Sequence, residues 1–137
     1  HEVKPMFDLN FNETGQNPDK LSLNVDYQKY AEYEALGALF FFVCRVDGKA
    51  IGYCMFVTLK GGHHKDLIVA LNDVIFVLPE FRKNGIGTHL INFAENHMKG
   101  IGVHKISWEI RTQKDWSPIL KKKGYVQEAV IYGKLLE

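Results

Sequence analysis

The sequence predicts a single α/β domain with a central mixed β-sheet flanked by helices. Two observations lead to this prediction. The chain has 137 residues, of which 46% are hydrophobic and 24% charged, which suits one compact domain of ordinary globular composition. Strand-like and helical patterns also alternate along it, in the order helix, hairpin, strand, helix, strand, helix, strand.

Residues 1–23 are expected to be an irregular N-terminal segment that belongs to the same domain. From residue 8 to residue 23 the chain is polar and contains the Gly, Asn and Pro residues that interrupt regular structure. Residues 24–37 have the features of a helix, with Asp26 as its N-cap and Gly37 as its end.

Residues 38–59 form the clearest hairpin of the chain. Two runs rich in β-branched and aromatic residues flank Asp47 and Gly48, the dipeptide best suited to a type I′ turn. Such a turn places Cys44 opposite Ile51 and away from Cys54, so both cysteines are expected to be reduced core residues. With no signal peptide and no apolar run of membrane-spanning length visible, we expect a cytoplasmic protein.

The second half of the chain continues the alternation. Residues 67–78 are largely apolar, as expected of a central strand that is covered on both faces and that Pro79 ends. Over residues 87–98 the apolar positions fall on one face of a helix; they are Leu90, Ile91, Ala94 and Met98. We expect a strand over 104–110, a short helix over 116–124 and a final strand or hairpin over 125–136.

The junction between the central strand and the long helix carries Arg82, Lys83, Gly85 and Gly87. The first N–H groups of a helix have no internal partner and attract anions. Glycine lets the backbone approach a phosphate closely, and the two basic side chains add full charges. Residues 82–88 therefore predict a cradle for a pyrophosphate.

Two common phosphate-binding loops do not fit this junction. A P-loop needs Lys and then Ser or Thr after its last glycine, but Thr88 and His89 follow Gly87. A dinucleotide-binding fingerprint needs a third glycine where the chain has Leu90. A chance glycine pair in a βα turn of another fold remains the alternative.

The whole string around the junction resembles the central motif of the GNAT family of acetyl-CoA-dependent N-acetyltransferases. That motif, V-x-P-x-[YF]-[RQ]-x-x-G-x-G/A, is matched by Val77, Pro79, Phe81, Arg82, Gly85 and Gly87. The hairpin segment "VDGKAIGY" and the later "LKKKGY" extend the resemblance over residues 24–137 as an acetyltransferase domain. More loosely, "YEALGALFF", "HHKDLIVALNDVIFVLPEFR" and "IYGKLL" look like small GNAT proteins encoded by tailed bacteriophages.

The resemblance implies a binding site for acetyl-CoA as co-substrate. Backbone groups of Ile75, Phe76 and Val77 would pair with the pantetheine arm. Backbone N–H groups at the junction would hold the pyrophosphate, and they belong to Arg82, Lys83, Asn84, Gly85, Ile86, Gly87 and Thr88. We expect no metal, since the histidines lack the spacing of zinc ligands. The net charge of +1 gives no sign of a nucleic-acid partner, nor do we expect a membrane partner; the protein would be a monomer or a homodimer.

Two residues are candidates for the base that deprotonates the acceptor amine. Asp73 is the first, because a carboxylate within an apolar strand costs free energy to bury unpaired; alternatively, it bonds to backbone at an irregularity such as a β-bulge. His64, in the turn before that strand, is the second, with a solvated turn as the alternative. The family's general acid, a tyrosine, falls at Leu120, so no acid is identified; Tyr125 and Tyr132 are expected to pack instead.

The leading functional prediction is an N-acetyltransferase. It would move an acetyl group from acetyl-CoA to a primary amine by direct attack, the acceptor being a protein lysine or N-terminus or a small cationic amine. Acidic residues predominate in residues 1–36 and would, with Tyr27, Tyr30 and Tyr33, face a cationic acceptor. The missing tyrosine supports an alternative, a GNAT fold that binds CoA or a partner protein with little or no turnover.

Overall fold

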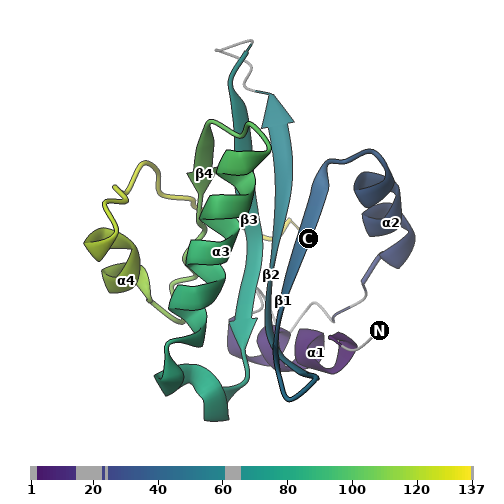
Figure 1. The fold of residues 1–137 in the computed structure, drawn as a ribbon, viewed down its shortest axis with the longest axis vertical. Helices are drawn as coiled ribbons and strands as arrows, with labels where there is room; N and C mark the ends of the chain where they lie inside the picture. Colours follow the sequence, from purple (N-terminus) through teal and green to yellow (C-terminus); the bar gives the residue numbers. More distant parts are fainter. Residues whose placement is uncertain (1–2, 15–22, 24, 61–65, 137) are drawn as a thin grey trace.

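The computed structural model describes residues 3–14, 23, 25–60 and 66–136. Its core is a four-stranded sheet in the order β1-β2-β3-β4 (Figure 1). The strand β2 (Lys49–Lys60) pairs antiparallel with both β1 (Leu39–Val46) and β3 (Ile68–Val77), and β4 (Lys105–Ser107) runs parallel to β3. The mixed sheet is the one predicted.

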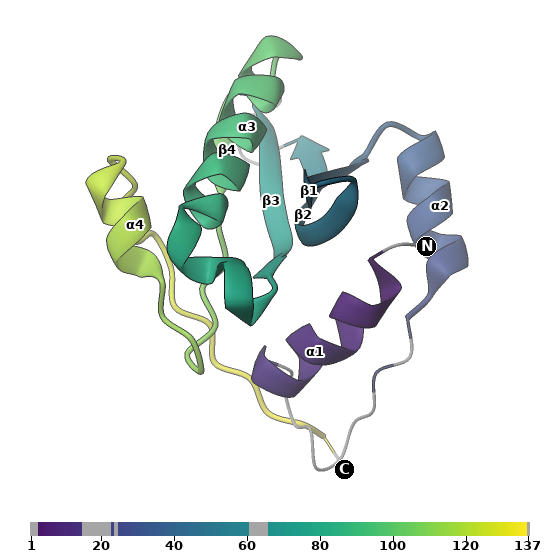
Figure 2. The same ribbon diagram turned by 60° about the horizontal axis from the view of Figure 1, so that its bottom comes forward.

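Helices cover both faces of this sheet (Figure 2). On one face lie α1 (Lys4–Thr14) and α2 (Tyr27–Ala35); on the other lie α3 (Ile86–Gly100) and α4 (Ser117–Lys122). A 3₁₀ helix, η1 (Pro79–Asn84), connects β3 to α3. None of the helices in the described ranges combines the length and the apolar character that crossing a bilayer requires.

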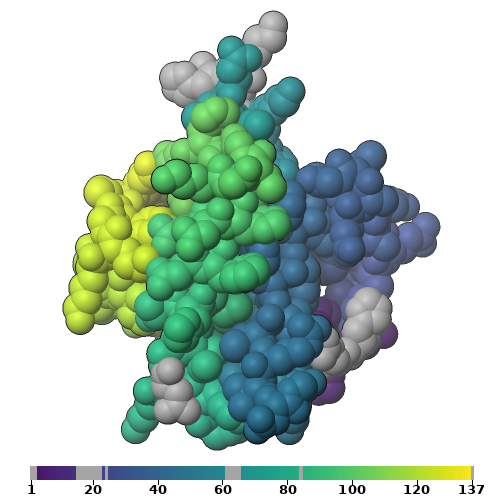
Figure 3. All heavy atoms as spheres, in the orientation of Figure 1, coloured from purple at the N-terminus to yellow at the C-terminus, as the bar shows by residue number. Residues whose placement is uncertain are grey.

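The two faces of the sheet carry separate apolar clusters. Figure 3 shows α3 covering one face, with the β1–β2 hairpin at one side of it and α4 at the other. The predicted apolar face of α3 is buried there, which confirms Leu90, Ile91, Ala94 and Met98 as core positions. On the opposite face Val3 and Met6 pack with Tyr53 and Phe76, which attaches α1 to the sheet.

The β1–β2 hairpin has the predicted turn but a different register. Asp47 and Gly48 both have positive φ, 51° and 78°, as a type I′ turn requires. A bulge between Cys44 and Arg45 pairs Cys44 with Gly52, so the prediction of Ile51 as its partner was wrong. Both cysteines are unbonded, and burial raises the pKa of the Cys54 thiol to about 12.

Both chain ends differ from the prediction. Residues 8–14 belong to α1 rather than to an irregular segment, because packing of α1 on the sheet outweighs its weak local helix signal.

At the C-terminal end, residues 125–136 form neither a strand nor a hairpin, so this segment does not pair with the sheet. Tyr132 is 93% exposed, so its expected packing was wrong, whereas Tyr125 is half-buried with its hydroxyl inside. The strand expected over 104–110 is shorter in the structure, where it consists of β4 alone.

A β-bulge interrupts the pairing of β2 with β3 at Asp73. Met55 pairs with Val74 and Phe56 with Asn72, so Asp73 is the extra residue between them. The side chain of Asn72 is buried, and its Nδ2 donates to the carbonyls of Met55 (3.2 Å) and Val74 (2.9 Å). Asn72 therefore holds together the two strands on either side of the bulge.

We expect Asn72→Ala to lower the free energy of unfolding by about 1–3 kcal/mol, because it removes the donor of two buried carbonyls. Urea unfolding followed by circular dichroism measures this. Asn96→Ala, at an exposed position of α3, is the control and should stay within about 0.5 kcal/mol of the wild type. An equal loss in both variants would show that the bulge does not depend on Asn72.

The C-terminal end of α1 is joined to η1 by an ion pair. The Arg82 guanidinium donates to both carboxylate oxygens of Glu13, at 2.8 Å from Nη1 and 2.6 Å from Nη2. Its Nε donates to the carbonyl of Val77 at 2.7 Å, and Lys114 Nζ lies 3.5 Å from Glu13 Oε2. The hydrogen bonds from Arg82 lower the pKa of Glu13 below its ordinary value of 4.5.

A carboxylate whose pKa is lower in the folded chain stabilises the fold above its unfolded-state pKa, and this contribution disappears as the pH falls through the folded-state pKa. Glu13→Gln should therefore be less stable than the wild type near pH 7, and the two should converge as the pH falls below about 4.5. Thermal unfolding across this range measures the difference. A gap that does not change with pH would mean that the carboxylate charge contributes nothing.

Candidate active site

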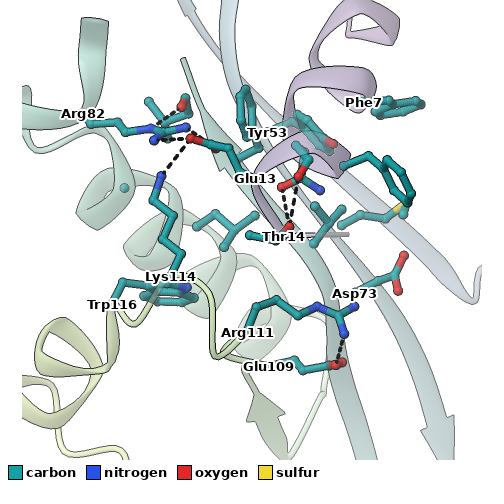
Figure 4. A pocket seen from close by; sticks show the side chains of 18 of the residues that line it. Phe7, Glu13, Thr14, Tyr53, Asp73, Arg82, Glu109, Arg111, Lys114 and Trp116 are labelled. Atoms are coloured by element: carbon teal, nitrogen blue, oxygen red, sulfur yellow. Dashed lines mark hydrogen bonds and ion pairs between the residues drawn. The ribbon is translucent and has the colours of Figure 1, made fainter. Parts of the chain in front are cut away.

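A cavity of about 510 Å³ lies between β3 and residues 109–119 (Figure 4). Its wall also includes residues of α1, α2 and β2 and the first turn of α3. The volume lies within the range of small-molecule sites in proteins, about 300–1,000 Å³. Figure 4 shows Arg82 and Lys114 toward one side of the cavity, and Asp73 and Phe7 toward the other.

The cavity exists because β3 and β4 separate. Their parallel pairing runs only from Val69 to Leu71 on β3, whereas β3 continues to Val77. Over these last residues, β3 has no strand neighbour on the β4 side in the described part of the chain. That edge offers backbone hydrogen-bonding groups to a ligand.

The alternation of the strand decides which backbone groups face this open edge. The N–H of Leu78 donates to the carbonyl of Ile51 on β2, and the carbonyl of Val77 faces away and accepts from Arg82. With a period of two, the backbone groups of Ile75 also face the open edge, whereas those of Phe76 face β2. Of the three predicted pantetheine partners, Ile75 and Val77 thus have the suitable orientation.

The glycine-rich junction forms an open helix N-terminus. Gly85 has a φ of 74°, which turns the chain from η1 into α3. The N–H of His89 is the first to bond back within the helix, to the carbonyl of Gly85, so the N–H groups of residues 86–88 precede the helical hydrogen bonds. Gly87 lines the cavity, and a Cβ there would meet no atom within 4 Å. The junction therefore has room for an anion.

Only some of the predicted cofactor residues line this cavity. Those in the cavity wall are Ile75, Phe76, Val77, Arg82 and Gly87. The side chains of Lys83 and Thr88 are exposed, and Ile86 packs against the core under α3. Arg82 lines the cavity but its guanidinium is bound to Glu13, a contact that no local pattern of residues predicts.

Asp73 lies in the cavity wall at the bulge, where Tyr30 of α2 reaches it. The Tyr30 hydroxyl donates to Asp73 Oδ2 at 3.4 Å. Burial and then the Asp73 carboxylate raise the pKa of Tyr30, so the phenol stays protonated and available as a donor. The same two causes raise the pKa of Tyr53, which lies buried in the same wall. Tyr30 thus lines the cavity, whereas Tyr27 stacks on Phe7 outside this wall.

A bulge was the alternative interpretation of Asp73, and the structure has both the bulge and the cavity. The side chain that bonds to backbone there is Asn72, which sequence reasoning missed. A signal was present, because the polar pair of Asn72 and Asp73 interrupts an otherwise apolar strand. His64 lies outside the described residues.

The wall opposite β3 contains no tyrosine at the place of the family's general acid. Leu120 is buried in the core, and the residues of this helical region that line the cavity are Trp116 and Ile119. Arg111 and Glu109 complete the wall as an ion pair of 3.1 Å. Within the described ranges, the acidic, histidine and cysteine side chains form no group of three that could hold a metal ion.

A curated relative has a similar sequence. It is an uncharacterized N-acetyltransferase of Methanocaldococcus jannaschii, 33% identical over 100 residues that make up 69% of this chain. The chain spans 42% of the length of that relative.

Solved structures share the fold at low sequence identity. An aminoglycoside acetyltransferase from an uncultured soil sample, in complex with sisomicin, has a TM-score of 0.76 at 14% identity, covering 99% of this chain and 87% of its own. An acetyltransferase of Trypanosoma brucei has a TM-score of 0.72 at 18% identity, covering 98% and 93%. A predicted acetyltransferase of Clostridium acetobutylicum, with acetyl-CoA, has a TM-score of 0.65 at 18% identity, covering 87% and 80%.

The family motif, the separated strands and the open helix N-terminus thus occur together in one domain. The model of the acetyltransferase (GNAT) family matches residues 6–117, which is most of the chain. The chain therefore belongs to the GNAT family of acetyltransferases.

Proposed function

We propose that this acetyltransferase moves the acetyl group of acetyl-CoA to a primary amine by direct attack of the amine on the thioester. The observation that carries the proposal is that one cavity contains the free edge of β3, the open N-terminus of α3 and the carboxylate of Asp73. The helix N-terminus suits a diphosphate, and the free strand edge suits an arm that carries amide groups. The carboxylate of Asp73 suits a cationic acceptor.

The residues of the cavity fit acetyl-CoA in a definite direction. The N–H groups of residues 86–88 would bind the pyrophosphate beside Gly87, where space is open. The backbone groups of Ile75 and Val77 would pair with the amides of the pantetheine arm. The thioester would then lie toward the bulge, on the side of Asp73.

The chemistry requires a neutral amine beside the thioester. A lysine-type ammonium has a pKa of about 10.4, so a base must take its proton near neutral pH. Asp73 would accept that proton directly or through one water and pass it to solvent. The amine nitrogen then forms a bond to the carbonyl carbon, the carbon–sulfur bond breaks, and the nitrogen loses its second proton to water. The thiolate takes a proton from water, because the position of the family's tyrosine is occupied by buried Leu120, which has no proton to donate.

That same wall favours a second candidate, a domain that binds acetyl-CoA or a partner protein with little turnover. Its specific support is that Ile119 and Leu120 both have hydrocarbon side chains, which cannot donate a proton to the leaving thiolate. Titration calorimetry with CoA and acetyl-CoA, together with thiol release in the presence of amines, separates the two candidates. Binding with thiol release supports the transferase, and binding without release supports the second candidate.

Gly87→Asp should weaken CoA binding by at least about a hundredfold, or about 2.7 kcal/mol, because it places bulk and negative charge against the pyrophosphate. The matched control is Gly100→Asp at the other end of α3, where an added Cβ also meets no atom within 4 Å. Calorimetry on both variants measures the effect. Unchanged affinity in Gly87→Asp would refute the proposed pyrophosphate site.

Asp73→Asn should leave CoA binding within about twofold and lower kcat/KM for the amine by about 10²–10⁴, the range of a lost general base. The loss should be larger at lower pH, where less of the free amine is already deprotonated. Initial rates of thiol release at several pH values measure this, with Glu34→Gln, an exposed carboxylate change on α2, as control. Equal rates for wild type and Asp73→Asn would remove Asp73 as the base and leave His64 as the candidate.

A further inference from the structure

The charged side chains of the cavity wall fall into two ion-paired groups and one separate carboxylate. Glu13 is bound to Arg82 and Lys114. Glu109 is bound to Arg111 at 3.1 Å. Asp73 accepts a hydrogen bond from the neutral hydroxyl of Tyr30, and no cationic group of the described residues pairs with it. The wall therefore offers a single uncompensated negative charge.

The surroundings of this carboxylate are mainly apolar. Four of the six aromatic residues that line the cavity belong to the walls of α1, α2 and β2, namely Phe7, Phe11, Tyr30 and Tyr53. Aliphatic and thioether groups complete this part of the wall, from Leu23, Val25, Met55 and Val74. Aromatic faces attract an ammonium group, and apolar walls stabilise a hydrocarbon body by its burial.

Two of the three cationic side chains of the wall, Arg82 and Lys114, lie on the other side of the cavity. Figure 4 shows both of them on the side away from Phe7, whereas Arg111, which is bound to Glu109, is drawn on the side of Asp73. A second ammonium of the acceptor inside the cavity would meet either Arg82 and Lys114 or the aliphatic groups of the wall. Both outcomes cost free energy, the first by like-charge repulsion and the second by desolvation of an unpaired charge.

Resting on the proposed acetyl transfer, we infer that the acceptor is a small primary monoamine with an apolar body, aromatic or aliphatic. Its ammonium binds Asp73 and the ring faces beside it, and its hydrocarbon body lies against the wall of α1, α2 and β2. Polycations such as polyamines and aminoglycosides are poor acceptors because the wall holds one free carboxylate. A protein lysine brings only its four-carbon stem to this wall, whereas a free amine can bury its whole body there.

The first test is a panel of acceptors with acetyl-CoA and the full chain. The probes are 2-phenylethylamine and hexylamine as monoamines, spermidine and sisomicin as polycations, and a lysine peptide. We expect kcat/KM for both monoamines to exceed the values for the other three by at least about tenfold. A higher value for spermidine, sisomicin or the peptide would overturn this inference and leave the acetyl transfer standing. No thiol release with any amine, despite acetyl-CoA binding, would overturn the transfer and this inference together.

The second test changes the number of carboxylates in the wall. Asn10→Asp adds one by an isosteric substitution on the cavity side of α1, and Asn12→Asp adds the same charge at an exposed position of the same helix. Asn10→Asp should shift the kcat/KM ratio of spermidine to hexylamine toward spermidine by about tenfold, the effect of one new short-range charge pair. Asn12→Asp should leave the ratio unchanged. Equal ratios in both variants would show that charge at this wall does not select the acceptor.

Discussion

The architecture of the site depends on the early separation of β3 from β4. Three residue pairs hold the two strands together, and β3 then continues as far as Val77 paired only with β2. This one departure creates the cavity and exposes the backbone edge of Ile75 and Val77. It also leaves the N-terminus of α3, with Gly87, facing the same space. A fully paired sheet would satisfy these backbone groups and leave no slot for a ligand.

The bulge at Asp73 gives this edge its chemistry. One additional residue reverses the faces of β3, so that Ala70 packs under α3 while Val74 and Phe76 pack on the α1 side. At the reversal, the Asp73 carboxylate lies at the cavity, and the buried amide of Asn72 stabilises the irregular backbone. A charged group is thus held within an apolar sheet without being buried itself.

Ion pairing divides the cavity into regions of different charge. Glu13 neutralises Arg82, so the arginine of the family motif has a structural role in holding α1 against η1. An anion at the junction would then be held mainly by backbone N–H groups, which no side-chain pairing can neutralise. At the other side, Asp73 keeps its charge available because its partner Tyr30 is neutral. The end of the cavity at the junction thus suits an anion, and the end at Asp73 suits a cation.

The sequence by itself determined the features that depend on neighbours along the chain, namely the turn at Asp47 and Gly48, the apolar face of α3 and the glycine-rich junction. Local dihedral preference and periodicity are enough for these. Only the tertiary structure decided the helix α1, the unpaired segment 125–136, the partner of Cys44 and the contacts of Asp73 and Arg82. Each of these depends on groups distant in sequence, because packing, register and ion pairing are set by what the folded chain brings together.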